Sequence, residues 1–453
     1  GMYNSSSSPI LTNVIIMNNS ASYFGGGIEN ISSSPTLVNV TLANNDAERF
    51  GGGMDNYISS SPTLTNSIVW GNTAQISAQI YNSVNSQPAV SFSDIQGAYA
   101  SGSWDGALGM DAGGNLDADP LFGTESAYPH SESPIVDRGS LSDLPLDLYD
   151  LDGDGDTSEA LPVDLEGIQR VYGAGVDLGA IEHRIWHVAQ DAAGAGDCTS
   201  WADACPDLKT ALSLPPREIW VAAGTYRPGS SGEVSATYEL HSGQALYGGF
   251  TGAETARDQR DWQTQAVILS GDLDASGSFS ANDANRVVTI PNADNSTTLD
   301  GFTITGGYST NLSGSGIYNL SGSPNLIHLT IHGNRNSFGG GGMYNYDGSP
   351  TLRRVTFSSN TAAGAGRSGG GLYSVAGRPI LEDVVFLNNS SAYGGGLRAN
   401  DVILRDVTFS GNSASLRGGG LHSGGTVSMT DIIFSSNTCA DGGGGASFSL
   451  SNH

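Results

Sequence analysis

Short stretches in which hydrophobic and polar residues alternate recur along most of the chain. A clear example is the segment Thr-Leu-Val-Asn-Val-Thr-Leu at residues 36–42. Alternation with a period of two places every second side chain on the same face of a β-strand. Strands this short are not stable alone and need neighbouring strands to pair with. The pattern therefore predicts an all-β chain with strands from different parts of the sequence packed side by side.

Clusters of glycine followed by an aliphatic residue show that these strands belong to a repeat. After each cluster comes a polar stretch that often contains Ser-Pro, then an alternating strand, then an asparagine turn. Adjacent clusters are 24 to 29 residues apart. Glycine fits tight corners where a Cβ atom would clash or where φ is positive. The clusters begin at Gly25, Gly51, Gly340, Gly369, Gly394, Gly418 and Gly443.

A repeat of this length predicts a right-handed parallel β-helix, a solenoid with coils of about 25 residues. Each coil pairs with the coils above and below it through parallel ladders, which lie about 4.8 Å apart. The asparagines at the strand ends tolerate left-handed backbone and can form side-chain ladders. We expect a structural role for these residues, including Asn360, Asn389, Asn412 and Asn437.

Interruptions of the repeat predict the organisation of the chain. Residues 1–123 form a first β-helix array, residues 124–185 form an irregular acidic cap and linker, and residues 186–453 form a second array. Near the start of the second array, apolar positions at helical spacing predict a short capping helix near residues 203–214. Such a helix would cover an open end of the β-helix and block edge pairing.

The glycine clusters recur together with a Phe-x-x-Asn motif. This combination resembles the repeat of the chlamydial polymorphic outer-membrane proteins and of related bacterial surface β-helices. The family repeat carries Gly-Gly-Ala before the aliphatic residue, whereas this chain mostly has Gly-Gly-Gly. The resemblance implies a secreted bacterial β-helix protein. The motif occupies residues 357–360, 386–389, 409–412 and 434–437.

The charge of the chain limits the classes of molecule that it is expected to bind. With 18 Lys and Arg against 45 Asp and Glu, the net charge is −27. Such a surface repels nucleic acid and anionic lipids and attracts cations, above all Ca²⁺, although solubility alone also explains it. No stretch approaches the roughly 18 apolar residues of a membrane span. We therefore expect an extracellular or cell-surface protein without nucleic acid binding or membrane insertion.

The chain begins inside a repeat, because Gly1-Met2-Tyr3-Asn4 reappears at residues 342–345. A processed fragment and a sequence that starts internally are both consistent with this. Open terminal coils would expose unpaired strand edges. Complementary ends on one molecule form a non-closing contact that gives filaments. Self-association through terminal coils is thus one expectation, and missing flanking coils are the alternative.

The three cysteines suggest an oxidising compartment. Cys198 and Cys205 lie close together in the segment Cys-Thr-Ser-Trp-Ala-Asp-Ala-Cys, and a local disulfide between them is expected. Cys439 stands alone next to a glycine run, where a small buried residue is the simplest interpretation.

The sharpest local motif lies in the acidic segment. Oxygen-bearing side chains at alternate positions, with glycines between them, suit a hard cation such as Ca²⁺. The segment begins like an EF-hand loop, but Leu161 stands where the loop needs its twelfth ligand. A solvated acidic linker is the alternative. The expected ligands are Asp150, Asp152, Asp154, Asp156 and Glu159.

Weaker clusters occur in the second array. Asp272 and Asp274, with Asn282 and Asp283 nearby, form a second candidate cation site. Asp383, Asp406 and Asp431 recur at equivalent places in successive coils. Arg354 lies at the corresponding place one coil earlier, and Arg405 neighbours Asp406. The column predicts either a carbohydrate-binding or cation-binding stripe or simply a solvated outer face.

Tyrosines recur around the glycine clusters. Exposed rings could stack on sugars, but half-buried ladders are the favoured interpretation. These residues are Tyr3, Tyr318, Tyr344, Tyr373 and Tyr393.

The residues point to a role without catalysis. A nucleophile, histidine and acid cannot be placed together, and the acidic residues of the second array are scattered. We predict a non-enzymatic extracellular structural or adhesive protein, with glycans or other surface proteins as further partners. A carbohydrate-binding or polysaccharide-cleaving β-helix is the alternative, and a groove with clustered carboxylates and an arginine would favour it.

Overall fold

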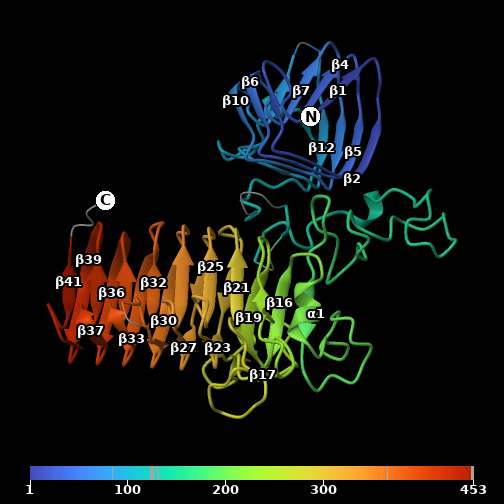
Figure 1. The fold of residues 1–453 in the computed structure, drawn as a ribbon. Helices are drawn as coiled ribbons and strands as arrows, with labels where there is room; N and C mark the ends of the chain where they lie inside the picture. The colour runs from blue at the N-terminus through green and yellow to red at the C-terminus, as the bar shows by residue number, and fades with distance from the viewer. Residues whose placement is uncertain (84, 123–126, 130–131, 365, 450–453) are drawn as a thin grey trace. The chain divides into compact units, whose positions relative to one another are not determined.

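The structure is a computed structural model and describes residues 1–83, 85–122, 127–129, 132–364 and 366–449. It is nearly all β, with a β-solenoid of about 17 turns, about 26 residues per turn and 3% helix. The prediction of an all-β parallel β-helix is therefore confirmed. The chain divides into two compact units, Gly1–Arg184 and Ile185–His453. Figure 1 shows each unit as a stack of coils.

In the first unit, the strands form three sheets whose neighbours pair in parallel. The first sheet contains β1 (Met2–Ser5), β4 (Ile28–Ile31), β7 (Met54–Tyr57) and β11 (Ile80–Asn82). The second contains β3 (Ser20–Ala21), β6 (Asp46–Phe50) and β10 (Thr73–Ile76). The third contains β2 (Ile10–Met17), β5 (Thr36–Ala43), β8 (Thr63–Thr65), β9 (Ile68–Trp70), β12 (Ala89–Ser91), β13 (Asp94–Ile95) and β14 (Met110–Asp111).

The second unit repeats this plan with longer sheets, each named here after one member. The β30 sheet has 13 strands: β15 (Ile185–Val188), β16 (Glu218–Ala222), β17 (Gly224–Tyr226), β19 (Ala245–Phe250), β20 (Val267–Ser270), β22 (Thr298–Asp300), β23 (Phe302–Thr305), β26 (Asn325–Ile327), β27 (Thr330–His332), β30 (Thr351–Ser358), β33 (Ile380–Leu387), β36 (Val402–Ser410) and β39 (Val427–Ser435).

The second unit contains two further, shorter sheets. The β29 sheet contains β18 (Tyr238–Glu239), β21 (Val288–Pro291), β25 (Ile317–Leu320), β29 (Met343–Tyr346), β32 (Leu372–Ser374), β35 (Leu397–Ala399), β38 (Leu421–Ser423) and β41 (Ala446–Phe448). The β31 sheet contains β24 (Tyr308–Ser309), β28 (Arg335–Asn336), β31 (Thr361–Ala362), β34 (Ser390–Tyr393), β37 (Ser413–Arg417) and β40 (Thr438–Cys439).

The register aligns like residues in successive coils. Phe357, Phe386, Phe409 and Phe434 are consecutive partners in the β30 sheet. Their rings stack with centroids 4.9, 4.9 and 5.0 Å apart, which matches the coil spacing. The first three rings are fully buried. The Phe-x-x-Asn motif thus builds a continuous aromatic stack through four successive coils of the second unit.

The asparagine of the same motif forms the predicted ladder. The Nδ2 atom of Asn389 donates to Oδ1 of Asn412 over 3.0 Å and to the carbonyl of Phe357 over 2.9 Å. Its own Oδ1 accepts from the backbone and side-chain nitrogens of Asn360. Each buried amide therefore closes the corner of its own coil and joins it to the next one.

Close backbone packing explains the glycine clusters. A Cβ atom on Gly370 would lie 2.5 Å from the carbonyl oxygen of Gly395, its equivalent in the next coil. The first glycine of that next cluster, Gly394, has a φ of 61°. The clusters therefore combine a left-handed residue with positions where any side chain would separate the coils.

A second left-handed column bends the strands of the β30 sheet. Arg354 in β30 and Asp383 in β33 both have a φ of 54°, and Asp406 and Asp431 have 52° and 56°. Aspartate and asparagine tolerate this conformation better than most residues. The corner thus supplies a backbone reason for the recurring aspartates. In the first unit, Asn13, Asn39 and Asn66 hold the same conformation, with φ between 50° and 55°.

Most of the region expected to be a cap and linker packs along the first solenoid. Ile135 and Leu178 are buried against Ile68 of β9. The amide of Asn66 donates to the Ser140 carbonyl over 3.0 Å and accepts from the Ser140 nitrogen over 2.7 Å. Little of this segment is regular secondary structure, so side chains and isolated bridges hold it.

The predicted capping helix is present but shorter than expected. It spans α1 (Leu208–Leu212), and Asp207 caps its first turn by accepting from the Lys209 nitrogen. Leu208 and Ala211 are buried, and α1 contacts β15 and β18. Prolines at positions 206, 215 and 216 flank the helix, and proline disfavours continuation of a helix beyond these points.

Candidate functional site

The acidic segment of the first unit folds as a loop on a short antiparallel stem. Leu146 and Ala160 form a β-bridge, and the Asp147 nitrogen donates to the Glu159 carbonyl over 3.0 Å. The Leu161 nitrogen also donates to the Pro145 carbonyl over 2.8 Å. The stem fixes both ends of the loop and places Asp147 opposite Glu159.

Backbone donors to aspartate oxygens shape the loop itself. Oδ1 of Asp150 accepts from the Gly155 nitrogen over 3.0 Å, and Oδ1 of Asp154 accepts from the Asp156 nitrogen over 2.7 Å. Asp156 accepts from both the nitrogen and the hydroxyl of Ser158, and these bonds lower its pKa. Several of the predicted ligands thus also hold the turn.

The structure brings most of the predicted ligands together in two overlapping groups. One oxygen from each of Asp150, Asp152 and Asp154 lies within 4.8 Å of the others, and the same holds for Asp147, Asp152 and Glu159. Asp156 belongs to neither group. The loop motif does not reveal Asp147, because the position of this residue depends on the pairing of the stem.

Two oxygens in the second group lack hydrogen-bond donors. Asp147 is 1% exposed, and its Oδ2 accepts from the Leu151 nitrogen over 2.7 Å. Its Oδ1 and the Oε1 of Glu159 are buried and have no donor among the described residues. Desolvation raises the pKa of Glu159, and the nearby aspartates raise it further. Converging oxygens without donors are suited to a divalent cation such as Ca²⁺.

In the weaker candidate cation site of the second unit, the carboxylates have hydrogen-bond donors. Oxygens of Asp272, Asp274 and Asp283 also lie within 4.8 Å of one another. Asp283 accepts from the nitrogen and hydroxyl of Ser280, and Asp272 accepts from the nitrogens of Ser276 and Gly277. The side chains of Ser276 and Asn282 hydrogen-bond to Asp274, and these bonds help to lower the pKa of that carboxyl. The carboxylates are therefore engaged in holding their own loop.

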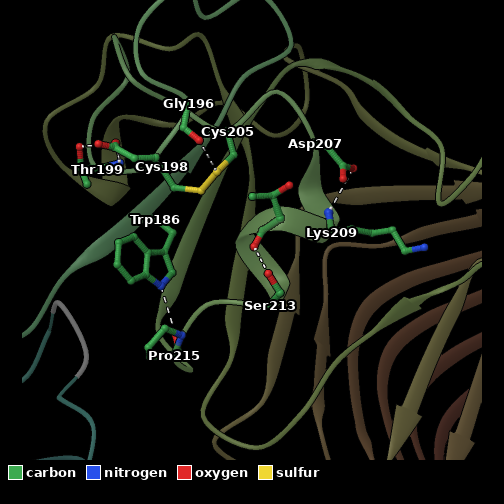
Figure 2. Close-up of a disulfide and its surroundings, with 11 residues drawn as sticks. Trp186, Gly196, Cys198, Thr199, Cys205, Asp207, Lys209, Ser213 and Pro215 are labelled. Carbon is green, nitrogen blue, oxygen red and sulfur yellow. Dashed lines mark hydrogen bonds between the residues drawn. A yellow bond between two sulfur atoms is a disulfide. The ribbon is translucent and has the colours of Figure 1, made fainter. Parts of the chain in front are cut away.

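Cys198 and Cys205 form a disulfide, with Cα atoms 4.6 Å apart (Figure 2). Both cysteines also pair with β15 through the backbone. The His187 nitrogen donates to the Cys198 carbonyl, and the Cys205 nitrogen donates to the His187 carbonyl, each over 2.9 Å. The disulfide thus closes a loop that is attached to the first strand of the second unit. Cys439 is partly buried and its thiol contacts the Gly442 carbonyl at 3.0 Å.

The outer face of the β30 sheet carries paired charges. Glu382 accepts from Arg353 over 2.9 Å and from Arg405 over 2.5 Å, and these bonds lower its pKa. Arg354 lies 3.9 Å from Asp383 in a mostly exposed pair. The predicted Asp383, Asp406 and Asp431 column is therefore part of a charged wall, and Glu382 in the adjacent column binds the arginines most closely.

A smaller network of charged and aromatic side chains connects to Arg354. Asp300 accepts from Arg260 over 2.6 Å and lies 2.8 Å from Nδ1 of His328. The His328 ring stacks on Trp262 with centroids 4.3 Å apart, and its Nε2 lies 3.1 Å from Arg354. The sequence does not reveal this network, because Arg260 and Trp262 come from a loop far from His328 in the sequence.

The predicted tyrosines fall into two groups. Tyr3 lies in the first unit and is 63% exposed. Tyr318, Tyr344 and Tyr373 are successive partners in the β29 sheet and half-buried, and Tyr393 lies at the end of β34. The rings of Tyr318 and Tyr344 stack with centroids 5.7 Å apart. The half-buried ladder that the sequence favoured is present in the second unit.

Comparison with known proteins gives one family match. Residues 406–424 match the model of the Chlamydia polymorphic membrane protein repeat. This stretch runs from the left-handed corner at Asp406 through Phe409 and Asn412 to the glycine cluster at 418–420. No curated protein and no solved structure gave a significant match. In the described part of the chain, no helix has the length and hydropathy of a membrane span.

The repeat match and the solenoid fit a β-helix repeat protein related to the chlamydial polymorphic membrane proteins. The repeat match suggests a bacterial surface protein.

Proposed function

We propose that this chain is a non-enzymatic extracellular protein that acts as a structural or adhesive scaffold on a cell surface. The observation that carries this proposal is the ladder of the β30 sheet, which continues from β15 to β39 in the second unit. Stacked coils of this kind hold outward side chains at fixed intervals of about 4.8 Å. Such a wall suits repeated weak contacts with an extended partner, whose strengths combine.

An adhesion assay tests the proposal. Beads coated with the full chain are passed under flow over bacterial and epithelial cell layers, beside beads coated with heat-unfolded chain. We expect retention of the beads that carry folded protein only. Equal retention of both bead types, or of neither, would contradict an adhesive role.

Polysaccharide cleavage is the alternative activity. The full chain is incubated with acidic and neutral polysaccharides, and release of new reducing ends or unsaturated ends is measured. Turnover that needs the folded chain would overturn the non-enzymatic role, and unchanged polysaccharides are the expected result.

Calcium binding by the acidic loop is part of this proposal. It is supported by the unpaired, buried oxygens of Asp147 and Glu159, which face Asp152 in one group. Calcium would neutralise carboxylates that otherwise repel one another and would rigidify a loop that has few other contacts. Extracellular calcium would then stabilise the segment that packs on the first solenoid.

Head-to-tail self-association is a further part of the proposal. It is supported by the uniform register of the coils, because a coil of a second copy can continue the same parallel ladder. Negative-stain electron microscopy with and without a calcium chelator tests it. Regular filaments are the expected result, and isolated short rods at high protein concentration would refute assembly.

A further inference from the structure

One edge of the second unit carries an aromatic–arginine stripe, defined as Tyr344, Arg367, Tyr373, Tyr393 and Arg398. Tyr344 and Tyr373 are partners in adjacent coils, with ring centroids 5.3 Å apart. The Arg398 guanidinium lies 5.8 Å from the ring centre of Tyr373 and 5.7 Å from that of Tyr393. The Arg367 guanidinium lies 4.4 Å from the ring centre of Phe338, and the Arg367 carbonyl accepts from the Tyr393 nitrogen over 2.9 Å. The stripe therefore runs across neighbouring coils, and cation–π contacts hold its arginines in place.

The two arginines of the stripe carry charge that the protein does not neutralise. Neither Arg367 nor Arg398 forms an ion pair with a described carboxylate, although the chain has a net charge of −27. The Nε atoms of both residues are buried and lack an acceptor among the described residues. By contrast, Arg353 and Arg405 on the β30 sheet share Glu382. In the described part of the chain, the Nη1 atom of Arg398 donates only to the neutral hydroxyl of Ser368, over 3.5 Å. Half-buried guanidinium groups without a carboxylate partner attract an anionic partner.

The tyrosines add hydrogen-bond donors along the same line. Within the described residues, the hydroxyls of Tyr344, Tyr373 and Tyr393 make no hydrogen bond to protein. Burial raises the pKa of Tyr344 to about 12, so its hydroxyl remains a donor at neutral pH. Ring faces also attract the C–H bonds of a sugar ring. The stripe thus offers a repeating set of phenols and cations rather than an enclosed pocket.

We infer that the aromatic–arginine stripe binds an anionic polysaccharide, a chain of sugars that carries carboxylate or sulfate groups. This inference rests on the proposed adhesive function and names the class of its ligand. Acidic groups would pair with Arg367 and Arg398, while sugar hydroxyls and ring faces would meet the tyrosines.

Equilibrium binding to defined polysaccharides tests the inference. The full chain is titrated with polygalacturonate, heparin and neutral dextran at low salt. We expect binding to at least one of the two acidic polymers and none to dextran, and the binding should weaken as salt rises. Equal binding to dextran, or no binding to either acidic polymer, would overturn the inference. Binding of polyglutamate with equal affinity would also overturn it, because the stripe would then recognise negative charge alone.

Matched variants locate the site. The double variant Arg367→Gln/Arg398→Gln should lose affinity by about tenfold or more, because two unpaired charges are removed. The double variant Arg353→Gln/Arg405→Gln removes the same charge from the β30 sheet and should change affinity by less than about twofold. Equal loss in both variants would place the binding elsewhere. Thermal unfolding of each variant verifies that the chain remains folded.

The two proposals can fail separately. If beads coated with the chain are retained on cells while acidic polysaccharides do not bind in solution, the adhesive role stands and the stripe is not its binding site. If polysaccharides bind but beads are not retained, the stripe is a binding site without an adhesive role.

Discussion

At the scale of residues, this fold is stabilised by side chains that meet their own equivalents in the next coil. The stacked rings of Phe357, Phe386 and Phe409 and the ladder of Asn389 and Asn412 are the main examples. Sequence reasoning predicts these contacts because a repeat with fixed spacing places equivalent residues above one another. Asp147 could not be predicted in this way, since its neighbours come from a stem that does not repeat.

Removal of one amide from the ladder should destabilise the second unit. In Asn389→Ala, the Asn360 nitrogen and the Phe357 carbonyl lose their side-chain partners. Each unsatisfied buried group costs roughly 1–3 kcal/mol, so we expect a decrease of about 3 kcal/mol in the free energy of unfolding. Asn295→Ala, at an exposed position, is the control and should change stability by less than about 0.5 kcal/mol. Chemical denaturation measures both, and equal effects would contradict the role of the ladder.

Calcium should stabilise the first unit through Asp147 and Asp152. Calcium at about 100 times its dissociation constant should add about 2.7 kcal/mol to the free energy of unfolding. Asp147→Asn should remove most of this gain, because it replaces the buried oxygen that lacks a donor with a neutral group. Thermal unfolding with calcium and with a chelator measures the gain.

The variant Asp156→Asn distinguishes the ligands indicated by the structure from those predicted by the loop motif. The motif predicts a ligand at this position, whereas the structure places Asp156 outside both groups of oxygens. We therefore expect Asp156→Asn to keep the gain from calcium. If Asp156→Asn loses the gain and Asp147→Asn keeps it, the arrangement of ligands proposed here is wrong.

At the scale of elements, the strands differ in how their charged side chains are paired and buried. In the first unit, Asp55 of β7 is paired in register with Glu29 of β4, so two acidic residues lie one coil apart. Asp55 is 2% exposed and Asp94 of β13 is fully buried. The alternating pattern predicts these strands well. It does not predict buried carboxylates, because alternation alone does not say which polar positions later coils cover, as the Ala118 nitrogen donates to Asp94 from the next coil.

The stability of the first unit should fall as the pH rises through these groups. Desolvation first, and then Glu29, raise the pKa of Asp55 from 3.8 to about 7. Desolvation is also the main cause that raises the pKa of Asp94 from 3.8 to about 7. The folded state therefore holds more protons than the unfolded state between these values. Its extra stability is complete below about pH 3.8 and is lost as the pH rises through about 7.

The double variant Asp55→Asn/Asp94→Asn isolates this effect. Because asparagine does not titrate, we expect the variant to be less sensitive to pH than the natural chain over the same window. Thermal unfolding between pH 4 and pH 8, roughly the window between the two pKa values, gives the difference between the two proteins. A difference that does not change with pH would contradict the inferred titration.

At the scale of the whole molecule, the chain consists of two compact units, Gly1–Arg184 and Ile185–His453. The repeat predicts the solenoid of each unit, since local alternation, glycine corners and asparagine ladders all agree. It does not predict how residues 132–184 pack on the first solenoid, because that contact depends on side chains such as Asn66 and Ser140 without any repeat. The described coils of both units nevertheless share the same corners and ladders.

The disulfide should stabilise one unit only. Cys198 and Cys205 lie in the second unit, and they close a loop of about eight residues, which corresponds to about 2.5 kcal/mol from chain entropy. We expect Cys198→Ala/Cys205→Ala to lower the unfolding temperature of the second unit and to leave that of the first unchanged. Calorimetry of the full chain measures both unfolding transitions. The transition that Asn389→Ala shifts belongs to the second unit, and the one that Asp55→Asn/Asp94→Asn shifts belongs to the first. A shift in the first transition would contradict this independence.

The asparagine ladder accepts coils of unequal length. The bonded pairs Asn360–Asn389 and Asn389–Asn412 are separated by 29 and 23 residues, yet both side-chain bonds measure 3.0 Å. The corners absorb the difference, so coils of different length fit the same asparagine ladder, glycine clusters and aromatic stack. A gene built from such units can gain or lose one by unequal recombination without creating a new kind of contact. Each event would change the reach of the protein by one step of about 4.8 Å.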